Sequence, residues 1–243
     1  MTSYEQMLTG EKPLHSMFSA IPRRYDLINH IITWGLDTRW RRQAARECTI
    51  SNPMRILDLC CGTGDLTVNI ARLVKRDVDI TGLDYSQPML EIAARKTELL
   101  AENKNISFTH GDVAVLPFPD GFFDCIGISF AFRNLTYKNP LARRHLAEIS
   151  RVLRPGGRCV IVETSQPNQK VVRKLFHLYL RWFVYAAGYL LSGNRGAYHY
   201  LSESAAKFYT PEELRKLLTT VGFRRVSFHP LFMGVAGVCV AVK

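Results

Sequence analysis

The residues best suited to chemistry lie in a glycine turn between an apolar run and a helix-like run. The stretch Leu57–Asp65 reads LDLCCGTGD and places glycines at positions 62 and 64. Glycine has no side chain, so the backbone at Gly62 and Gly64 can approach a ligand closely. The helix-like run that follows would begin with unpaired N–H groups and the positive end of its dipole. The turn therefore predicts a nucleotide-like ligand.

The residues around the second glycine argue against a phosphate in that ligand. A dinucleotide-binding turn needs a third glycine, in the pattern G-x-G-x-x-G, where this chain has Thr67. A P-loop needs Gly-Lys-Ser/Thr, which does not occur at Gly64. Asp65 also puts a carboxylate where a pyrophosphate would lie. We expect S-adenosylmethionine instead, because it carries a sulfonium and an ammonium group and no phosphate.

Polar residues recur at the ends of the following apolar runs. Asp84 ends the run from Val78, 20 residues after Gly64, where a carboxylate can accept hydrogen bonds from ribose hydroxyls. Asp112 follows the next run and can accept from an adenine amino group, and Ser129 ends a fourth run. Because the carboxyl ends of parallel strands meet at one edge of a sheet, these residues predict a single site along that edge.

Apolar runs alternate with helical periodicity along most of the chain. Such alternation predicts a parallel sheet with helices on both faces. We expect one domain over residues 1–243, of the α/β class, with a Rossmann-like, seven-stranded, mostly parallel sheet whose last strand is antiparallel. The expected strands are 54–59, 78–83, 106–111, 123–130, 158–164, 223–230 and 235–242, and the expected helices are 65–76, 87–102, 140–153 and 211–221.

Two helical segments stand outside this alternation. We expect residues 1–50 to form an N-terminal cap that acts as a lid, because apolar side chains recur at helical spacing at 27, 28, 31 and 32. We expect residues 168–209 to form a helical insertion for substrate or membrane. The apolar run from Trp182 to Leu191 is about half of the ~20 residues that cross a bilayer, which favours an interfacial or buried helix.

Composition and charge narrow the setting. The 243 residues are 47% hydrophobic, enough for one substantial core. The formal net charge is +11, and residues 166–243 contribute +8, with 11 Lys/Arg against three Glu. Such a basic face suits an anionic membrane, nucleic acid or an acidic partner. The first 20 residues lack an apolar leader run and the six cysteines lack metal-ligand spacing, so we expect a cytoplasmic protein with reduced thiols and no bound metal.

Four further stretches carry a resemblance to a known family. They are Tyr25–Asn29 (YDLIN) with Trp40 downstream, Ile128–Asn134 (ISFAFRN), Arg151–Ser165 (RVLRPGG through ETS) and Tyr198–Ser204 (YHYLSES). In this order they resemble the UbiE/MenG family of quinone C-methyltransferases, over nearly the whole chain. The sequence departs from the family pattern at Ile28, Asp37 and Ala131, where Met, His and Gly are usual.

The resemblance implies methyl transfer from S-adenosylmethionine to a ring carbon of a prenylated quinol, in menaquinone or ubiquinone synthesis. With the glycine turn and the strand ends, it implies a cofactor site at Asp58, Gly62, Thr63, Gly64, Asp84, Tyr85, Asp112, Val113 and Ser129. With the basic C-terminal third, it favours peripheral association with the inner face of an anionic membrane. A homodimer is left open as a further expectation.

C-methylation needs an electron-rich ring carbon, so the site must stabilise negative charge on a ring hydroxyl. We expect Arg133 to stabilise the developing phenolate, because a guanidinium stays protonated in proteins. We expect Asn134 beside it to orient a hydroxyl. The residue that accepts the proton is left open among Tyr25, His199, Tyr198 and Asp37.

Two other functions remain open. The chain could methylate another small lipid or aromatic acceptor, or bind the cofactor without catalysis as a degenerate Rossmann-like domain. The presence of Asp58, Gly62, Gly64 and Asp84 argues against the second. We do not expect nucleic acid as a substrate, because Ser129–Phe132 stands where a base methyltransferase has Asn/Asp-Pro-Pro and an aromatic residue.

Overall fold

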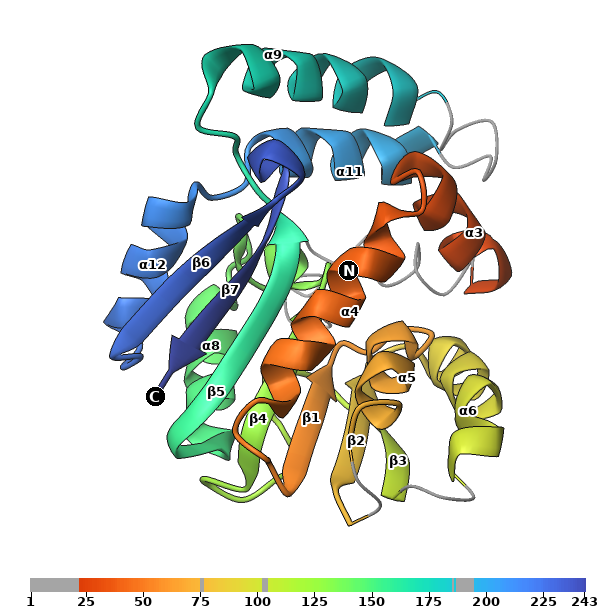
Figure 1. The fold of residues 1–243 in the computed structure, drawn as a ribbon, viewed down its shortest axis with the longest axis vertical. Coiled ribbons are helices and arrows are strands. Elements are labelled where there is room, and N and C mark those ends of the chain that lie inside the picture. Colours follow the sequence, from red (N-terminus) through yellow and green to blue (C-terminus); the bar gives the residue numbers. More distant parts are fainter. Residues whose placement is uncertain (1–21, 75–76, 102–104, 185, 187–194) are drawn as a thin grey trace, which may run out of the picture.

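Seven strands form one sheet in the order β3-β2-β1-β4-β5-β7-β6 (Figure 1). The computed structural model describes residues 22–74, 77–101, 105–184, 186 and 195–243, with the backbone alone at 22–25, 99, 101 and 195–200. β1 to β5 run parallel, and β7 pairs antiparallel with both β5 and β6, so the expected fold class is confirmed. The strands are β1 (Arg55–Leu59), β2 (Asp79–Asp84), β3 (Asn105–His110), β4 (Phe123–Ser129), β5 (Leu153–Thr164), β6 (Arg225–Leu231) and β7 (Ala236–Val242).

Helices cover both faces of this sheet (Figure 1). Successive strand side chains point to opposite faces, so Ile56 belongs to the apolar cluster that contains α4 and α5 residues, while Leu57 and Leu59 belong to the cluster that contains α8 and α12 residues. The helical elements are α3 (Pro22–Ile32), α4 (Leu36–Thr49), α5 (Asp65–Ala71), α6 (Gln87–Ala101), α7 (Phe132–Thr136), α8 (Ala142–Val152), α9 (Lys170–Tyr179), the π-helical turn η1 (Leu180–Val184), α11 (Arg195–Ala206), α12 (Pro211–Thr220) and the 3-10 turn η2 (Phe232–Gly234).

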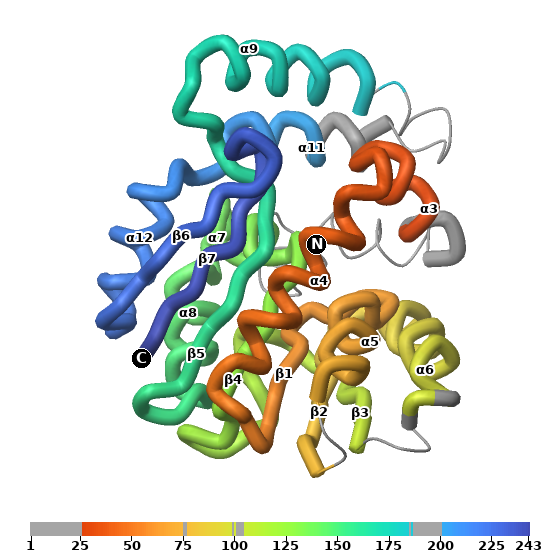
Figure 2. Tube along the Cα trace, in the orientation of Figure 1, coloured from red at the N-terminus to blue at the C-terminus, as the bar shows by residue number. Residues whose placement is uncertain are grey.

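Three helices far apart in the sequence meet at one end of the molecule. α3 from the predicted cap lies beside α9 and α11 from the predicted insertion, beyond the carboxyl ends of the parallel strands (Figures 1 and 2). A small apolar cluster joins them, formed by Ile28, Ile32, Leu180, Val184 and Ala205. The cap and the insertion are therefore packed as one assembly above the edge where the site was predicted.

The structure differs from the expected elements most clearly at β5, at α5 and at the short helix α7, which was not predicted. β5 begins at Leu153, five residues before the predicted start at 158, because Leu153 pairs with Phe123 across a register shift in β4. α5 ends at Ala71 and not at residue 76. None of the six cysteines forms a disulfide, and five of them are buried.

Candidate active site

The glycine turn between β1 and α5 uses its two glycines differently. Both have positive φ, +54° at Gly62 and +80° at Gly64. A Cβ at Gly64 would lie 2.9 Å from the Cβ of Ala93, so this glycine lets α6 pack against the turn. A Cβ at Gly62 would meet no atom within 4 Å. The space over Gly62 is therefore open to a ligand.

A cavity lies over this turn at the carboxyl edge of the sheet. Seven of the nine predicted cofactor residues line it: Gly62, Thr63, Asp84, Tyr85, Asp112, Val113 and Ser129. Asp58 and Gly64 are not among the lining residues. We call this space the cofactor cavity.

Two carboxylates in the cofactor cavity are fixed by backbone N–H groups. Asp84 accepts hydrogen bonds from Gly62 at 2.8 Å and from Ser86 at 2.9 Å. Asp112 accepts one from the backbone of Ala114 at 2.9 Å. Burial raises the pKa of Asp84 despite these bonds. A carboxylate oxygen has two lone pairs, so the fixed carboxylates can also accept from the hydroxyl or amino groups of a ligand.

Asp58 lies behind the turn and not in the cavity. Its side chain is fully buried and accepts a hydrogen bond from the Thr67 hydroxyl at 2.6 Å. Burial raises the pKa of Asp58 to about 7. Asp58 therefore links the end of β1 to the start of α5.

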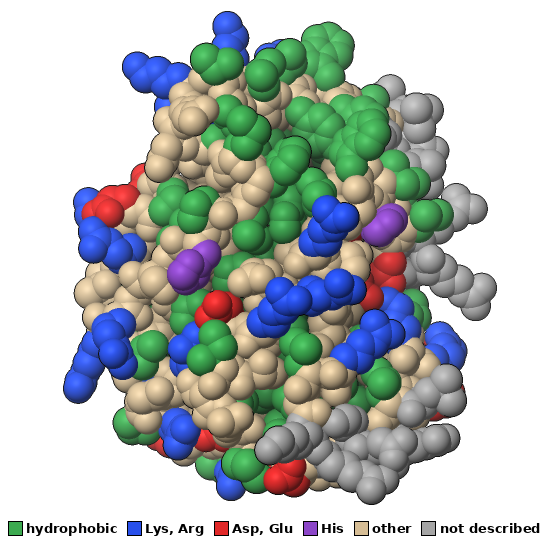
Figure 3. All heavy atoms as spheres, in the orientation of Figure 1, with side chains coloured by type: hydrophobic (Ala, Val, Ile, Leu, Met, Phe, Trp, Pro, Cys, Tyr) green, Lys and Arg blue, Asp and Glu red, His purple; other side chains and the backbone are tan. Residues whose placement is uncertain are grey.

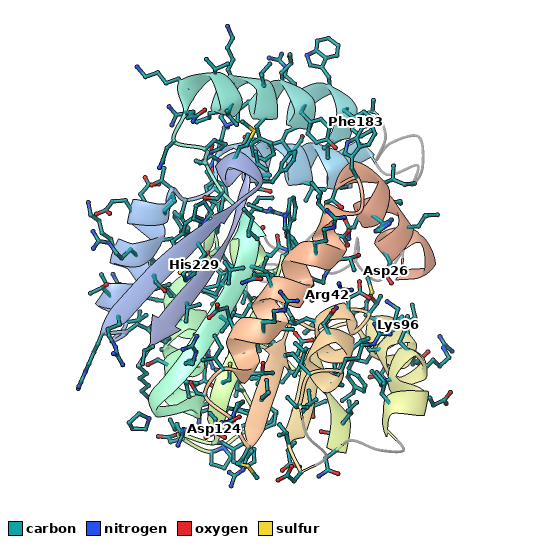
Figure 4. All side chains as sticks on the ribbon, viewed as in Figure 1. Asp26, Arg42, Lys96, Asp124, Phe183 and His229 are labelled. Carbon is teal, nitrogen blue, oxygen red and sulfur yellow. The ribbon has the colours of Figure 1, made fainter. Side chains whose placement is uncertain are left out.

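A cluster of acidic side chains surrounds one lysine beside the turn. Lys96 on α6 donates to Asp26 at 2.5 Å, to Asp65 at 2.7 Å and to the Thr63 hydroxyl at 3.1 Å. Thr63 donates in turn to Asp26 at 2.6 Å. Burial alone would lower the pKa of Lys96. The hydrogen bonds with Asp26 and Asp65 outweigh burial, so the pKa is raised. Figure 4 shows Asp26 and Lys96 approaching each other from α3 and α6, so this Lys96 cluster ties the cap to the turn.

A second cavity of about 550 Å³ lies between the sheet and the helices α3, α9, η1 and α11. Its lining is mostly apolar, with Trp40, Phe176, Tyr179, Leu180, Leu201 and Val235 among the residues. Its polar lining residues include two hydrogen-bonded pairs, Arg41 with Asp37 and Arg133 with Thr164. We call it the apolar cavity. It shares Arg41 and Phe130 with the cofactor cavity, so the two spaces adjoin at these side chains.

The two adjacent catalytic candidates on α7 face different cavities. Arg133 lines the apolar cavity, and its Nη1 donates to Glu163 and to Thr164, each at 3.0 Å. Its Nε is buried without a hydrogen-bond partner. Asn134 lines the cofactor cavity, and its Oδ1 is likewise buried and unpartnered. The side chains of the other two predicted catalytic residues, Tyr25 and His199, lie outside the described residues.

Arg41 is a site residue that the sequence reasoning did not identify. Its Nε donates to the Ser129 hydroxyl at 3.1 Å, and its Nη1 donates to Asp37. The guanidinium carbon lies 5.1 Å from the ring centroid of Phe130. Burial alone would raise the pKa of Asp37. The charge of Arg41 and the side-chain hydrogen bonds to Asp37 outweigh burial, so the pKa is lowered. The i, i+4 spacing of Asp37 and Arg41 predicts their pairing on one helix face, but no local signal links Arg41 to Ser129.

The polar groups of the cofactor cavity fit S-adenosylmethionine. Two buried lining atoms, Ser86 Oγ and Asn134 Oδ1, have no hydrogen-bond partner and are free to bind a ligand. Asp84 and Asp112 line the cavity and offer carboxylate acceptors; their contacts with ribose hydroxyls and an adenine amino group stay a prediction. No group of His, Cys, Asp or Glu among the described residues could hold a metal ion.

The chain is similar to methyltransferases in sequence and in structure. Residues 6–243 match the model of the ubiE/COQ5 methyltransferase family. The chain is 41% identical over 237 residues to the demethylmenaquinone methyltransferase of Thermotoga maritima, covering 95% of this chain and 97% of the relative. It is 40% identical over 224 residues to the enzyme of the same name from Thermus thermophilus, covering 92% and 98%.

Among solved structures, a SAM-dependent methyltransferase from Aquifex aeolicus superposes with a TM-score of 0.55 at 19% identity, over 78% of this chain and 81% of that one. This likeness supports the fold alone. The family match and the two relatives cover nearly the full chain. The protein therefore belongs to the ubiE/COQ5 methyltransferase family and is an S-adenosylmethionine-dependent methyltransferase.

Proposed function

We propose that this methyltransferase acts on a ring carbon of a prenylated quinol, with demethylmenaquinol as the first candidate. The observation that carries the proposal is the apolar cavity of about 550 Å³ that adjoins the cofactor cavity at Arg41 and Phe130. A cavity of this size and apolar lining suits a ring with an isoprenoid chain. The two demethylmenaquinone methyltransferases that the chain resembles support the naphthoquinol over the benzoquinol.

The residues around the meeting point of the cavities have distinct tasks in this proposal. S-adenosylmethionine supplies the methyl group as an electrophile. Arg133 holds a positive charge beside the ring site, fixed by Glu163 and Thr164, and stabilises the negative charge that builds on the ring hydroxyl. Asn134 orients polar groups on the cofactor side. Phe130 and Trp40, whose rings lie 6.2 Å apart, keep water from the reacting carbon.

The direct test supplies labelled S-adenosylmethionine and a panel of reduced quinones, read by mass spectrometry. The panel contains demethylated naphthoquinols and benzoquinols with short and long prenyl chains, and unprenylated ring controls. Label in a ring methyl group of a prenylated naphthoquinol is the expected result. Methylation of an unrelated aromatic or lipid acceptor instead would support the other enzymatic function. Binding of S-adenosylmethionine without turnover on any acceptor would support a non-catalytic domain.

We also propose that the protein binds the surface of an anionic membrane through α9. Val171, Leu175, Leu178 and Trp182 form an apolar stripe at helical spacing, and each is more than half exposed. Lys170, Lys174 and Arg181 are exposed beside this stripe. Figure 3 shows hydrophobic side chains gathered over this end of the molecule, with Lys and Arg side chains at its upper edge.

An amphipathic helix with cations beside its apolar stripe lies in the plane of a membrane interface. Val172 and Leu175 of α9 also line the apolar cavity, so lipid contact would place the cavity next to a membrane-dissolved substrate. None of the described helices is long and apolar enough to cross a membrane.

Liposome flotation tests this surface. We expect the protein to float with vesicles containing anionic lipid and Leu178→Glu to stay in the lower fraction. Leu73→Glu is the matched control, because Leu73 is 45% exposed and follows α5, away from α9. Equal flotation of Leu178→Glu and Leu73→Glu would rule out α9 as the contact.

A further inference from the structure

The cofactor cavity carries an uneven set of charges. Asp26, Asp65, Asp84 and Asp112 line it, and Arg41 is the only lysine or arginine among its described lining residues. The methyl donor brings a sulfonium, an ammonium and one carboxylate to this cavity. The first two groups suit a wall of aspartates. The carboxylate needs a cationic or N–H partner, which that wall does not supply.

We propose that Arg41 binds the carboxylate of the methyl donor. Its Nη1 donates to Asp37 and lies 3.7 Å from a carboxylate oxygen of Asp65. Its Nε donates to the Ser129 hydroxyl at 3.1 Å, and its guanidinium carbon lies 5.1 Å from the ring centroid of Phe130. Only 7% of the residue is exposed. The inference rests on S-adenosylmethionine occupying the cofactor cavity: the family assignment gives the donor, and the lining residues point to this cavity.

The guanidinium of Arg41 still has donors to offer. A guanidinium has five N–H groups, and the N–H groups of Nη2 have no hydrogen-bond partner in the described part of the chain. The planar fork of an arginine matches a carboxylate better than a point charge does. Because Asp37 and Ser129 fix the other nitrogens, a carboxylate bound at Nη2 would meet a donor that is already in place.

Lys96 is the other cation close to the turn, and its donors are used. An ammonium has three N–H donors. Lys96 makes three hydrogen bonds, to Asp26, Asp65 and the Thr63 hydroxyl. It is also absent from the described lining of the cofactor cavity. Arg41 is therefore the better partner for the carboxylate.

Arg41 lines the apolar cavity as well, so two other roles compete with this one. It could bind the acceptor ring, or it could only hold α4 against Ser129 and Phe130. These roles predict different effects of the same substitution. A carboxylate contact affects only ligands that carry the carboxylate, a ring contact affects only the acceptor, and a purely structural role affects every ligand of the cofactor cavity.

The experiment is a calorimetric comparison of two ligands, made without acceptor. S-adenosylmethionine is compared with decarboxylated S-adenosylmethionine, which keeps the adenosine, sulfonium and amino groups and lacks only the carboxylate. We expect Arg41→Gln to weaken S-adenosylmethionine binding by roughly tenfold or more, the loss typical of a charged hydrogen bond. Its affinity for the decarboxylated ligand should stay within about twofold of the parent protein.

Two further variants make the comparison decisive. Arg42→Gln is the matched control, because Arg42 is the next residue on α4 and is exposed. It should change neither affinity. Asp37→Asn with Arg41→Gln repeats the test without a buried unpaired carboxylate, which protects the result against misfolding of the single variant.

Each outcome decides between the roles. Equal weakening of both ligands by Arg41→Gln would overturn the proposal in favour of a structural role. Unchanged binding of both ligands, with a raised KM for the quinol, would overturn it in favour of the acceptor. Failure of the parent protein to bind S-adenosylmethionine would overturn the donor assignment itself. Failure to methylate any quinol would leave the calorimetric result intact, so the two proposals fail separately.

Discussion

Arg133 and Glu163 form an ion pair whose side chains are only 4% and 3% exposed. Glu163 accepts from the Arg133 guanidinium and also from the backbone N–H of Arg133. Taking two charges out of water is costly, and such a pair is stable only with further hydrogen bonds, such as the one to Thr164. Removing one partner would therefore destabilise the fold and, if Arg133 acts as proposed, would also slow methyl transfer.

We predict that Arg133→Met with Glu163→Gln abolishes most methyl transfer while the protein stays folded. The single variant Arg133→Met leaves a buried carboxylate unpaired, at a cost of roughly 3–5 kcal/mol, and the double variant avoids this. Turnover should fall by about 100-fold or more, because a fixed positive charge beside the developing phenolate is gone. Affinity for S-adenosylmethionine, measured by calorimetry, should not change. Near-normal turnover in the double variant would show that Arg133 is only structural.

We predict that Asp58 makes the protein less stable as pH rises from about 4 to 7. Its folded-state pKa is about 7 against the ordinary value of 3.8, so the folded state binds more protons than the unfolded state over this range. The free energy of unfolding then falls through this window and levels off above it, by roughly 4 kcal/mol in all. Asp58→Asn cannot ionise and should flatten the profile in urea unfolding between pH 4.5 and 8.5.

Asp77→Asn is the control for this profile, because Asp77 is exposed. It should follow the parent protein at every pH. If Asp58→Asn also runs parallel to the parent protein, burial does not shift the pKa of Asp58.

At the element scale, the predicted parts were those whose signals are local. The start of α12 follows from its capping box, in which Thr210 accepts from the backbone of Glu213 and Glu213 accepts from the backbone of Thr210. The strands follow from their apolar runs. The early start of β5 depends on pairing with β4, and a run of residues does not encode its pairing partner. The same limit applies to Arg41 with Ser129, which lie 88 residues apart.

The Lys96 cluster is another contact of this distant kind, and it joins elements 70 residues apart. We predict that Lys96→Met loosens α3 and leaves the sheet intact. The side chain of Lys96 is 31% exposed, so the loss of global stability should stay within about 1 kcal/mol. Hydrogen exchange should quicken in α3 and stay unchanged in α8.

Lys207→Met is the matched control, because Lys207 forms an exposed ion pair with Glu203 on α11. It should leave exchange in α3 unchanged. Unchanged exchange in α3 of Lys96→Met would mean that the apolar cluster around Ile28 and Ile32 alone holds the cap.

At the scale of the whole molecule, β7 connects the parallel strands, which end at β5, with the edge strand β6. It lies between β5 and β6 and pairs along its length with both. Its residues from Ala236 to Ala241 are all buried. Residues of β7 and of β1 belong to the same apolar clusters, so the core needs both strands.

We predict that Gly237→Ala destabilises the whole protein by about 1–3 kcal/mol, as overpacking does. A Cβ at Gly237 would lie 2.0 Å from Cζ of Phe228, whose ring covers this glycine from β6. In a Phe228→Ala background the same substitution should cost much less. Urea unfolding of the four proteins measures this coupling. Equal costs in both backgrounds would contradict the packing explanation.

The central place of β7 has a consequence for synthesis on the ribosome. The strands β1 to β4 and their helices lie within residues 55–152, so this part can begin to fold while the rest is still being translated. The sheet stays incomplete until residues 236–242, which form β7, have emerged from the ribosome. Until then β5 presents an unpaired edge, which is a template for aggregation. The chain therefore most needs a chaperone while residues 164–236 are being translated, and a pause in this interval would prolong that need.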